Sequence, residues 1–492
     1  MASELAARNG GRLGLAALVA ILLLGLGLRV GNAWDGREPV YDATAYAAIA
    51  ANLERGEGFT VGATATQPSS NYSPGLPLLV AGAYEISGGV HERLARILLA
   101  FVGTLSVLFT YLLGRHLCRL LTLPGYRRAN SASVAAGLIG AAAVAVYPAL
   151  LEYQGMLMSE PLAATLLSAS VLAIFWAADV NRSGLSNGER EERGSENGPS
   201  LARPQDPLSS RYPFATWLLP GMLLGALALV RPEYLGVALL LGVVVLAGRL
   251  RDGWRTGLVQ AAILLAGVAV VVAPWTVRNA VALDRVVPIS TGGGQVLFAG
   301  TYLPSDGDPE KVGAEVVARH PGLFASADAR RLRLEQILAR LAAARYPDLD
   351  TNRALSRMGR EQLWDDVSER PLEYAGFVVA KVGRIWSHGP RDVMREPLWA
   401  ALHWAVVGFG LLGLGLLAWR RRWEALVLAT ILLSITALSA LLVASPRRVL
   451  AMLPLIAALA GVGATWAWSA IQAGRHDDVP PGSTDSLSPG RT

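Results

Sequence analysis

The sequence predicts an all-α, polytopic membrane protein, and three observations carry this prediction. Of its 492 residues, 52% are hydrophobic and only 17% are charged. Apolar runs of about 20 residues, the length of a helix that crosses a bilayer, recur along the chain. Nearly all basic residues are arginines clustered between these runs, as membrane orientation requires. Nucleic-acid binding is therefore not expected, despite a net charge of +6.

Ten apolar runs are expected to span the membrane. They lie at 13–30, 94–114, 131–150, 161–178, 214–230, 233–248, 257–275, 398–419, 424–443 and 449–470. A shorter run at 75–89 follows Pro74 and contains Pro77, and we expect it to be re-entrant or interfacial. The arginine clusters between spans then fall on the cytoplasmic side, together with both chain ends. Counting 75–89 as a crossing gives an alternative of 11 spans.

The runs divide the chain into four predicted regions. Residues 1–275 form an N-terminal transmembrane catalytic module, with a first external loop at 31–90 and a second at 151–160. A polar stretch at 179–212, rich in Ser, Gly and charge, is expected to be a disordered cytoplasmic linker. Three parts follow, namely a small external domain, mainly helical, at 276–396, transmembrane helices at 397–470, and a disordered cytoplasmic tail at 471–492. The start of the external domain, with alternating apolar residues and a glycine run, suggests short strands or a tight loop.

The first external loop contains an amphipathic helix that begins at Asp42. Tyr46, Ile49 and Leu53 follow on one face at helical spacing. Asp42 is a candidate catalytic carboxylate, and the alternative is a helix N-cap, which is compatible with catalysis.

The second external loop offers two more carboxylates, Glu152 and Glu160. Two external loops that each supply a carboxylate at one membrane depth suit acid–base chemistry on a bound acceptor. The alternative for Glu160, which precedes Pro161, is a favourable interaction with a helix dipole.

Four arginines oppose the orientation bias, because they lie at external ends of apolar runs. They are Arg231, Arg278, Arg447 and Arg448. Guanidinium groups at the external boundary suggest an anionic partner such as a lipid phosphate. Snorkelling explains one such arginine more readily than four. The six histidines are scattered and the single cysteine is Cys118, so we expect no metal site.

Several short motifs occur in an order that resembles a known family. The first is D-x3-Y with A-x2-L and G-x-G-F, from Asp42 to Phe59, and YSPGLPLLVAG follows from Tyr72. MLMSEPL around Glu160, RPE at 231–233, PWTVRN at 274–279 and RRVLAMLPLIAALAG at 447–461 complete the series. The pattern resembles GT-C membrane glycosyltransferases, in the branch of protein O-mannosyltransferases and aminoarabinose transferases. It departs from that branch at Ala43, where a glutamate is common, and at Tyr72–Ser73, where a lysine stands in the aminoarabinose enzymes.

This resemblance implies a GT-C-like fold and transfer of a sugar, with inversion, from a polyprenyl-phosphate-linked donor to an acceptor. The acceptor is a lipid, glycan or protein on the external face of the cell membrane. Asp42 matches the aspartate that orients or deprotonates the acceptor, Glu160 the acidic residue of the second loop, and the external arginines the donor phosphate site. The further expected substrate-binding residues are Tyr46, Tyr72, Glu152, Glu233 and His388. No cofactor is expected.

Two other classes of function remain open on the sequence. A transporter or flippase of a lipid-linked glycan would also need arginines at the boundary, but polar residues at mid-span would be expected. An external binding module on an inert anchor would not need ten spans.

Overall fold

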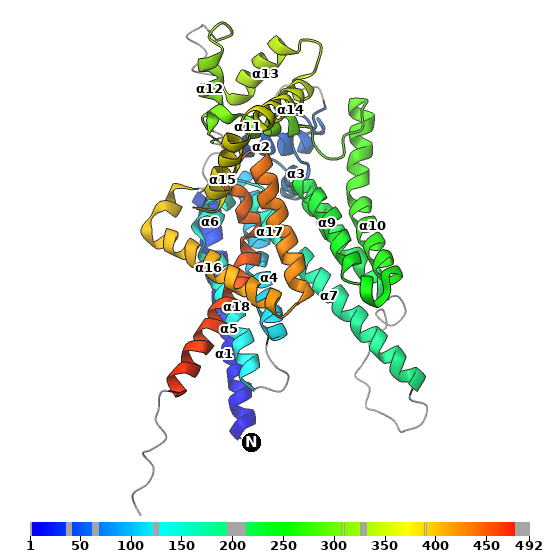
Figure 1. Ribbon diagram of the computed structural model, residues 1–492, viewed down its shortest axis with the longest axis vertical. Coiled ribbons are helices and arrows are strands. Elements are labelled where there is room, and N and C mark those ends of the chain that lie inside the picture. The colour runs from blue at the N-terminus through cyan, green and yellow to red at the C-terminus, as the bar shows by residue number, and fades with distance from the viewer. Residues whose placement is uncertain are drawn as a thin grey trace, which may run out of the picture.

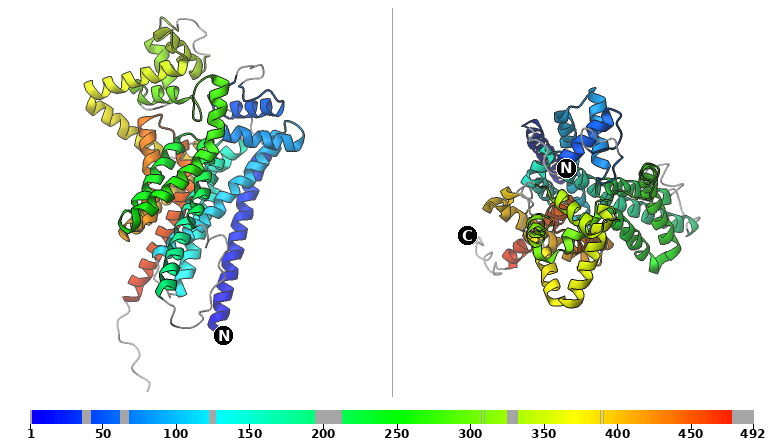
Figure 2. Two further views of the ribbon diagram at one scale, coloured as in Figure 1. Left: turned by 90° about the vertical axis from the view of Figure 1, so that its right-hand side faces the viewer. Right: turned by 90° about the horizontal axis from the view of Figure 1, so that it is seen from above.

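The computed structural model describes residues 2–35, 42–61, 68–121, 127–193, 213–306, 308, 310–324, 332–387, 389 and 391–477. Within these residues all regular secondary structure is helical (Figure 1). Long helices form a bundle, and a domain of shorter helices covers one end of it. The start of α1 and the end of α18 both lie at the opposite end (Figures 1 and 2).

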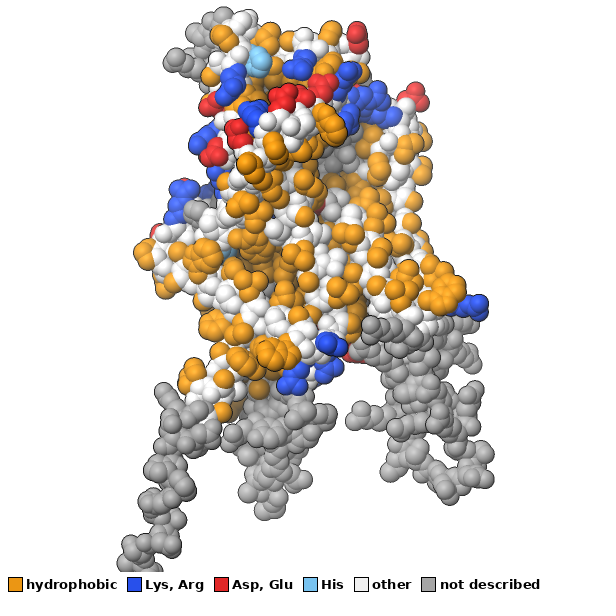
Figure 3. Space-filling model, viewed as in Figure 1, with side chains coloured by type: hydrophobic (Ala, Val, Ile, Leu, Met, Phe, Trp, Pro, Cys, Tyr) orange, Lys and Arg blue, Asp and Glu red, His pale blue; other side chains and the backbone are white. Residues whose placement is uncertain are grey.

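The bundle consists of the helices with the longest apolar segments and the shorter helices between them. They are α1 (Ala2–Asp35), α4 (Glu92–Leu121), α5 (Arg127–Val146), α6 (Pro148–Gly155), α7 (Glu160–Arg193), α8 (Leu218–Val230), α9 (Glu233–Ala247), α10 (Leu250–Leu283), α16 (Pro397–Trp419), α17 (Trp423–Leu441) and α18 (Arg447–Asp477). The 3-10 turn η1 (Pro213–Trp217) precedes α8. Apolar side chains cover the flank of the bundle, whereas charged side chains gather over the domain at its end (Figure 3). This distribution is the one that a bilayer around the bundle requires.

Eight of the ten predicted spans are matched by helices of crossing length. Seven helices qualify individually within the described residues, and the α5–α6 pair, bent by 47°, makes the eighth. The runs at 214–230 and 233–248 form α8 and α9, which have only 13 and 15 residues. Each is shorter than the roughly 20 residues of a full crossing, because Arg231 and Pro232 interrupt the helical path between them.

The most buried of these helices is α18, which passes through the middle of the bundle. In its apolar window 83% of the residues are buried, against 17% in α1. Small residues let its backbone approach α5, since a Cβ at Gly461 would meet the carbonyl oxygen of Ala136 at 1.9 Å. Arg447 and Arg448 begin this helix, so they are carried by the span with the most buried apolar window.

The bend between α5 and α6 follows from Pro148. Proline has no N–H to donate to the carbonyl of Val144 four residues earlier. The buried guanidinium of Arg29 in α1 replaces that donor, with Nη2 at 3.1 Å from the Val144 oxygen and Nη1 at 3.3 Å from the Ala145 oxygen. Nη1 also donates to Gly25 in its own helix at 3.0 Å. Arg29 is thus the cap of a broken helix at membrane depth.

The covering domain is built on a second hydrophobic core. Its helices are α11 (Gly293–Thr301), η2 (Leu303–Ser305), α12 (Val312–Arg319), α13 (Leu334–Arg345), α14 (Thr351–Glu369) and α15 (Pro371–Ser387), and η4 (Asp392–Arg395) leads into α16. Beside it, α2 (Asp42–Glu54) and α3 (Gly75–Ser87) lie across the same end of the bundle (Figure 2). The described part of the region predicted at 276–396 is thus helical, and its first residues complete α10.

Of the two expectations for the start of this domain, the short strands were wrong, whereas a loop at 284–292 does lead into α11. Residues of the glycine run begin α11, and the run serves helix packing. A Cβ at Gly294 would meet the backbone oxygen of Asn352 in α14 at 2.1 Å, and Gly294 N donates to Asn352 Oδ1 at 2.7 Å. The alternating apolar residues Val287 and Ile289 lie in the loop before α11, and both are buried.

Two predicted segments lie partly outside the described residues. The described part of the linker, 179–193, continues α7, and the described part of the tail, 471–477, continues α18. Nothing in the structure tests disorder in the remainder of either segment.

Candidate functional site

Six charged side chains meet at the end of the bundle that the small domain covers. They are Asp42, Glu160, Arg231, Glu233, Arg447 and Arg448, called here the charge cluster. Three carboxylates face three guanidinium groups, so the formal charges cancel.

The chain brings these residues together by starting four helices at one place. Asp42 opens α2, Glu160 opens α7, Glu233 opens α9 and Arg447 opens α18. Prolines 161, 232 and 446 stand next to three of these starts, where a missing N–H costs nothing. Because the positive ends of four helix dipoles converge, the site favours an anion beyond what its side chains provide.

Arg447 joins the two carboxylates that the sequence singled out. Its Nε lies 2.7 Å from Glu160 Oε1, and its Nη1 lies 3.1 Å from Asp42 Oδ2. The guanidinium carbon also lies 5.5 Å from the centre of the Tyr153 ring. The helices α2, α7 and α18 are therefore tied together through one side chain.

Arg231 and Arg448 form the other half of the charge cluster. Arg231 Nε lies 2.9 Å from Glu233 Oε1, and Arg448 Nε lies 3.9 Å from the same oxygen. Arg448 Nη1 donates to the carbonyl of Val443 at 2.6 Å. Arg448 is thus anchored to the chain just before α18.

Burial differs sharply within the charge cluster. The side chain of Glu160 is 0% exposed and that of Arg447 26%, whereas Asp42 is 42% exposed. Two buried polar atoms, Glu160 Oε2 and Arg231 Nη1, have no hydrogen-bond partner among the described residues. Arg231 Nη1 is 3.4 Å from Glu160 Oε1, near enough for charge attraction. Such orphaned atoms are costly unless a ligand or water completes them.

Tyr46 and Tyr72 lie near Asp42 of the charge cluster. Tyr46 is buried one turn after Asp42, and its ring meets that of Tyr72 edge to face at 5.8 Å. Burial, with the charges of Asp42 and Glu160, raises the pKa of Tyr46 well above its usual range. Burial also raises the pKa of Tyr72, and its hydroxyl donates to Glu335 at 3.3 Å. Both hydroxyls therefore stay protonated at neutral pH.

Two of the expected substrate-binding residues, Glu152 and Arg278, lie outside the charge cluster. Glu152 forms a bidentate ion pair with Arg391, with N–O distances of 2.8 and 3.1 Å. Arg278 donates to the carbonyls of Ser69 and Phe59, so it holds the loop after α2. His388 lies outside the described residues. Sequence reasoning missed Tyr153 and Arg391, although Tyr153 stands beside the acidic residue of the second loop.

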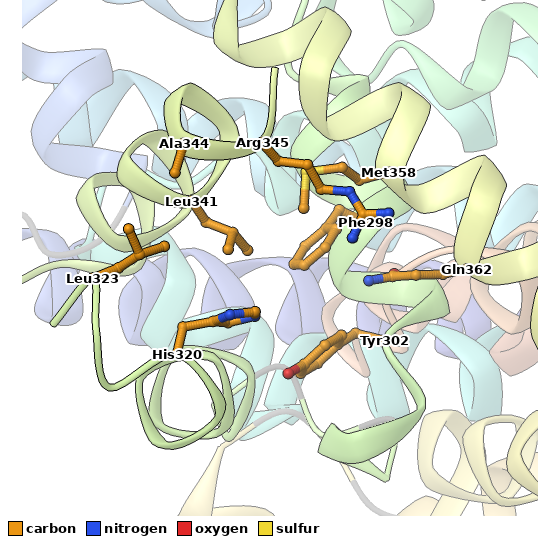
Figure 4. A pocket seen from close by; sticks show the side chains of 9 residues that line it. All are labelled: Phe298, Tyr302, His320, Leu323, Leu341, Ala344, Arg345, Met358 and Gln362. Carbon is orange, nitrogen blue, oxygen red and sulfur yellow. The ribbon is translucent and has the colours of Figure 1, made fainter. Parts of the chain in front are cut away.

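A cavity of about 240 Å³ opens within the covering domain (Figure 4). Phe298, Leu341 and Met358 supply apolar walls, and Tyr302 and Gln362 supply polar groups. The hydroxyl of Tyr302 is buried without a partner among the described residues. The cavity is lined by none of the charge cluster. The described residues contain no group of three or more His, Cys, Asp or Glu that could hold a metal ion.

Comparison with known proteins gives the fold. No protein-family model matches the chain, and no curated protein matches it. Solved structures of the oligosaccharyltransferase AglB from Archaeoglobus fulgidus do match. The apo form has a TM-score of 0.53 at 18% identity, and the complex with an inhibitory peptide and a dolichol-phosphate 0.51 at 16%. They cover 96% and 97% of this chain, which spans about half, 53%, of theirs.

The chain therefore has the all-α fold of the GT-C membrane glycosyltransferases, as predicted. ArnT from Cupriavidus metallidurans bound to undecaprenyl phosphate covers 95% of this chain and 80% of its own length at 13% identity, with a TM-score of 0.34. That score is too low to place the chain in the aminoarabinose-transferase branch, which stays a prediction.

Proposed function

We propose that this protein transfers a sugar from a polyprenyl-phosphate-linked donor to an acceptor at the membrane face covered by α11–α15. The observation that carries the proposal is the charge cluster, which combines a half-exposed carboxylate with largely buried guanidinium groups and orphaned polar atoms. The fold adds support, because AglB of the same fold was solved with a dolichol-phosphate. We infer that this face is extracytoplasmic and that both chain ends are cytoplasmic.

In this proposal the arginines of the charge cluster bind the donor phosphate. Arg447 and Arg231 border the most buried part of the charge cluster, and Arg231 Nη1 has a hydrogen bond left to give. Glu160 touches both guanidinium groups and is wholly buried, so we assign it the positioning of these arginines. Guanidinium groups bind phosphate oxygens bidentately and stabilise the charge that the leaving phosphate acquires.

Asp42 is placed on the acceptor side because it is the most exposed carboxylate of the charge cluster. It accepts the proton of the acceptor hydroxyl while the hydroxyl oxygen bonds to the anomeric carbon. The bond from that carbon to the phosphate oxygen breaks, and its electron pair stays on the phosphate. Attack opposite the leaving group inverts the anomeric configuration. Tyr46 then borders the acceptor as a neutral hydrogen-bond donor, and Tyr72, whose hydroxyl donates to Glu335, packs against its ring.

The donor is tested by identifying lipids that purify with the protein in mild detergent. Mass spectrometry should find a polyprenyl-phosphate-linked sugar, or its polyprenyl phosphate product, with the wild type. Arg447→Gln should retain much less of it, because the guanidinium that contacts both carboxylates is gone while Arg231 and Arg448 remain. Arg285→Gln is the matched control, since Arg285 pairs with Asp350 at the surface of the covering domain. Ordinary phospholipid alone in all three samples contradicts the proposal.

The base is tested by Asp42→Asn, which keeps the shape of the side chain and removes its basicity. Transfer from the donor identified in this way should fall by about 10²- to 10⁴-fold, the usual contribution of general-base catalysis. If Asp42→Asn transfers sugar at the wild-type rate, Asp42 is not the base. Protein-dependent flipping of that lipid across a reconstituted bilayer, unaffected by Asp42→Asn, would instead favour the flippase.

A further inference from the structure

Arg447 has two carboxylate partners that differ greatly in how firmly they hold it. Its contact with Glu160 is short, at 2.7 Å, and lies against a fully buried side chain. Its contact with Asp42 is longer, at 3.1 Å, and Asp42 is 42% exposed. Solvent screens an exposed ion pair and makes it weak. The pair with Asp42 is therefore the one that a ligand can replace.

The charge balance indicates what would replace it. With three carboxylates and three guanidinium groups, the charge cluster is formally neutral before any ligand binds. A donor phosphate diester adds a negative charge at a largely buried place, where uncompensated charge is expensive. Asp42 is the carboxylate that can turn toward water at little cost, because Glu160 is fully buried and Glu233 is only 16% exposed.

The same contact restrains Asp42 in the absence of donor. Its Oδ2 accepts from Arg447 Nη1, so that oxygen is engaged and less able to accept the proton of an acceptor hydroxyl. Tyr46, packed one turn further along α2, keeps the start of that helix in place while the carboxylate changes partner.

From these observations we propose that Arg447 is a donor-operated latch on Asp42. The donor phosphate takes over Arg447 Nη1, and Asp42 is released to the acceptor side. The released carboxylate accepts the hydroxyl proton as the new glycosidic bond forms and the bond to phosphate breaks, leaving its electron pair on the phosphate. The donor thus binds before the acceptor. While the donor site is empty, Asp42 stays paired with Arg447 and is less able to accept a proton from water. This inference rests on the proposed function.

The latch predicts that donor phosphate and Asp42 compete for Arg447. Binding of farnesyl phosphate in detergent micelles, followed by isothermal titration calorimetry, should be at least about fivefold tighter for Asp42→Asn than for the wild type, a typical strength for coupled sites. Asp42→Glu keeps the charge and should retain the competition. Glu85→Gln makes the same change of charge on the exposed surface of α3 and should bind as the wild type does.

A second pair of variants separates the latch from simple repulsion between carboxylate and phosphate. In an Arg447→Gln background the latch is already absent, so adding Asp42→Asn should change the affinity for farnesyl phosphate less than about twofold. Repulsion alone predicts that the full gain persists in that background, and such a result overturns the latch. Equal affinity of the wild type and Asp42→Asn also overturns it while leaving the donor class intact. No binding by either protein argues against the proposed function itself.

Discussion

Lys381 is a buried lysine near the place where the covering domain meets the bundle. It is one of only two lysines in the chain, and its side chain is fully buried in α15. Its Nζ donates to the carbonyl of Gly300 at the end of α11, at 2.6 Å. Burial, with a smaller contribution from the charge of Arg448, lowers the pKa of Lys381 to about 7.

This lysine should make the stability of the protein depend on pH. Its folded-state pKa lies below the unfolded value of 10.5, so above about pH 7 the unfolded chain binds the extra proton. The free energy of unfolding should then rise with pH by roughly 1 kcal/mol per pH unit relative to Lys381→Met, which lacks the group. Thermal unfolding in detergent at about pH 6 to 9 measures the difference. Lys311→Met, at the exposed lysine, should run parallel to the wild type, and parallel curves for Lys381→Met would refute the prediction.

At the residue scale the sequence pointed to the members of the charge cluster but not to their partners. Arg231, Arg447 and Arg448 stood out because their charge opposed the predicted orientation of the spans. Arg278 met the same criterion, yet it contacts Phe59 and Trp275 at ring distances of 5.5 and 4.9 Å and supports a loop. Which carboxylate each arginine meets depends on how distant helices pack, and no local pattern encodes that.

Among the elements, the bent α5–α6 pair depends on a contact far away in the chain. The guanidinium of Arg29 donates to the carbonyls of Val144 and Ala145 near the break at Pro148. These bonds require the guanidinium to be buried, which costs its hydration. Arg29→Met should cost stability because Val144 and Ala145 lose their donor, while it also removes a charge whose burial is unfavourable. The net change of Arg29→Met alone is therefore less informative than its dependence on Pro148.

A double-mutant cycle isolates that dependence. In a Pro148→Ala background the new N–H can donate to the Val144 carbonyl, so Arg29→Met should cost about 1 kcal/mol less than in the wild type. Unfolding in detergent measures each corner of the cycle. Arg12→Met, at an exposed arginine of the same helix, should show no coupling to Pro148→Ala. Additive effects of Arg29→Met and Pro148→Ala would mean that the guanidinium does not act as the cap.

Sequence patterns predicted the long apolar helices well and the short elements less well. Eight of the expected spans have matching helices because about 20 apolar residues leave few alternatives to a crossing helix. The segment around Gly292–Gly294 was ambiguous, since a glycine run suits a turn as well as close packing. The contact of Gly294 with Asn352 of α14 shows that the glycine run serves helix packing. Asn352 is 58 residues away in the chain, so no local pattern reveals this contact.

On the scale of the whole molecule, the covering domain is fastened to the loop between α2 and α3. Thr291 N donates to the carbonyl of Ser70 at 2.8 Å, and the Thr291 hydroxyl donates to Asn71 at 2.9 Å. The hydroxyl of Tyr72 reaches Glu335 in α13. The domain therefore holds the loop that carries Tyr72 against α2, on the side of the charge cluster where we place the acceptor.

A second fastening joins the far end of the covering domain to α6. Arg391, next to η4, holds Glu152 of α6 by two hydrogen bonds, and both side chains are largely buried. Tyr153, the next residue, lies against Arg447. Loss of the Glu152–Arg391 pair should therefore disturb the arginine that we assign to the donor, although neither residue belongs to the charge cluster.

Glu152→Gln and Arg391→Gln test this coupling together. Each change alone should lower the free energy of unfolding by about 1–3 kcal/mol, because it leaves a partly buried charge without its main partner. Each should also weaken binding of farnesyl phosphate, since Tyr153 no longer supports Arg447.

The double variant should be no worse than the more damaging single variant, because the second change removes the charge that the first left without its main partner. Arg395→Gln, at an exposed arginine of η4, serves as the control. Single variants that lose stability but bind farnesyl phosphate as the wild type does would confine the pair to holding the domain in place and separate it from the donor site.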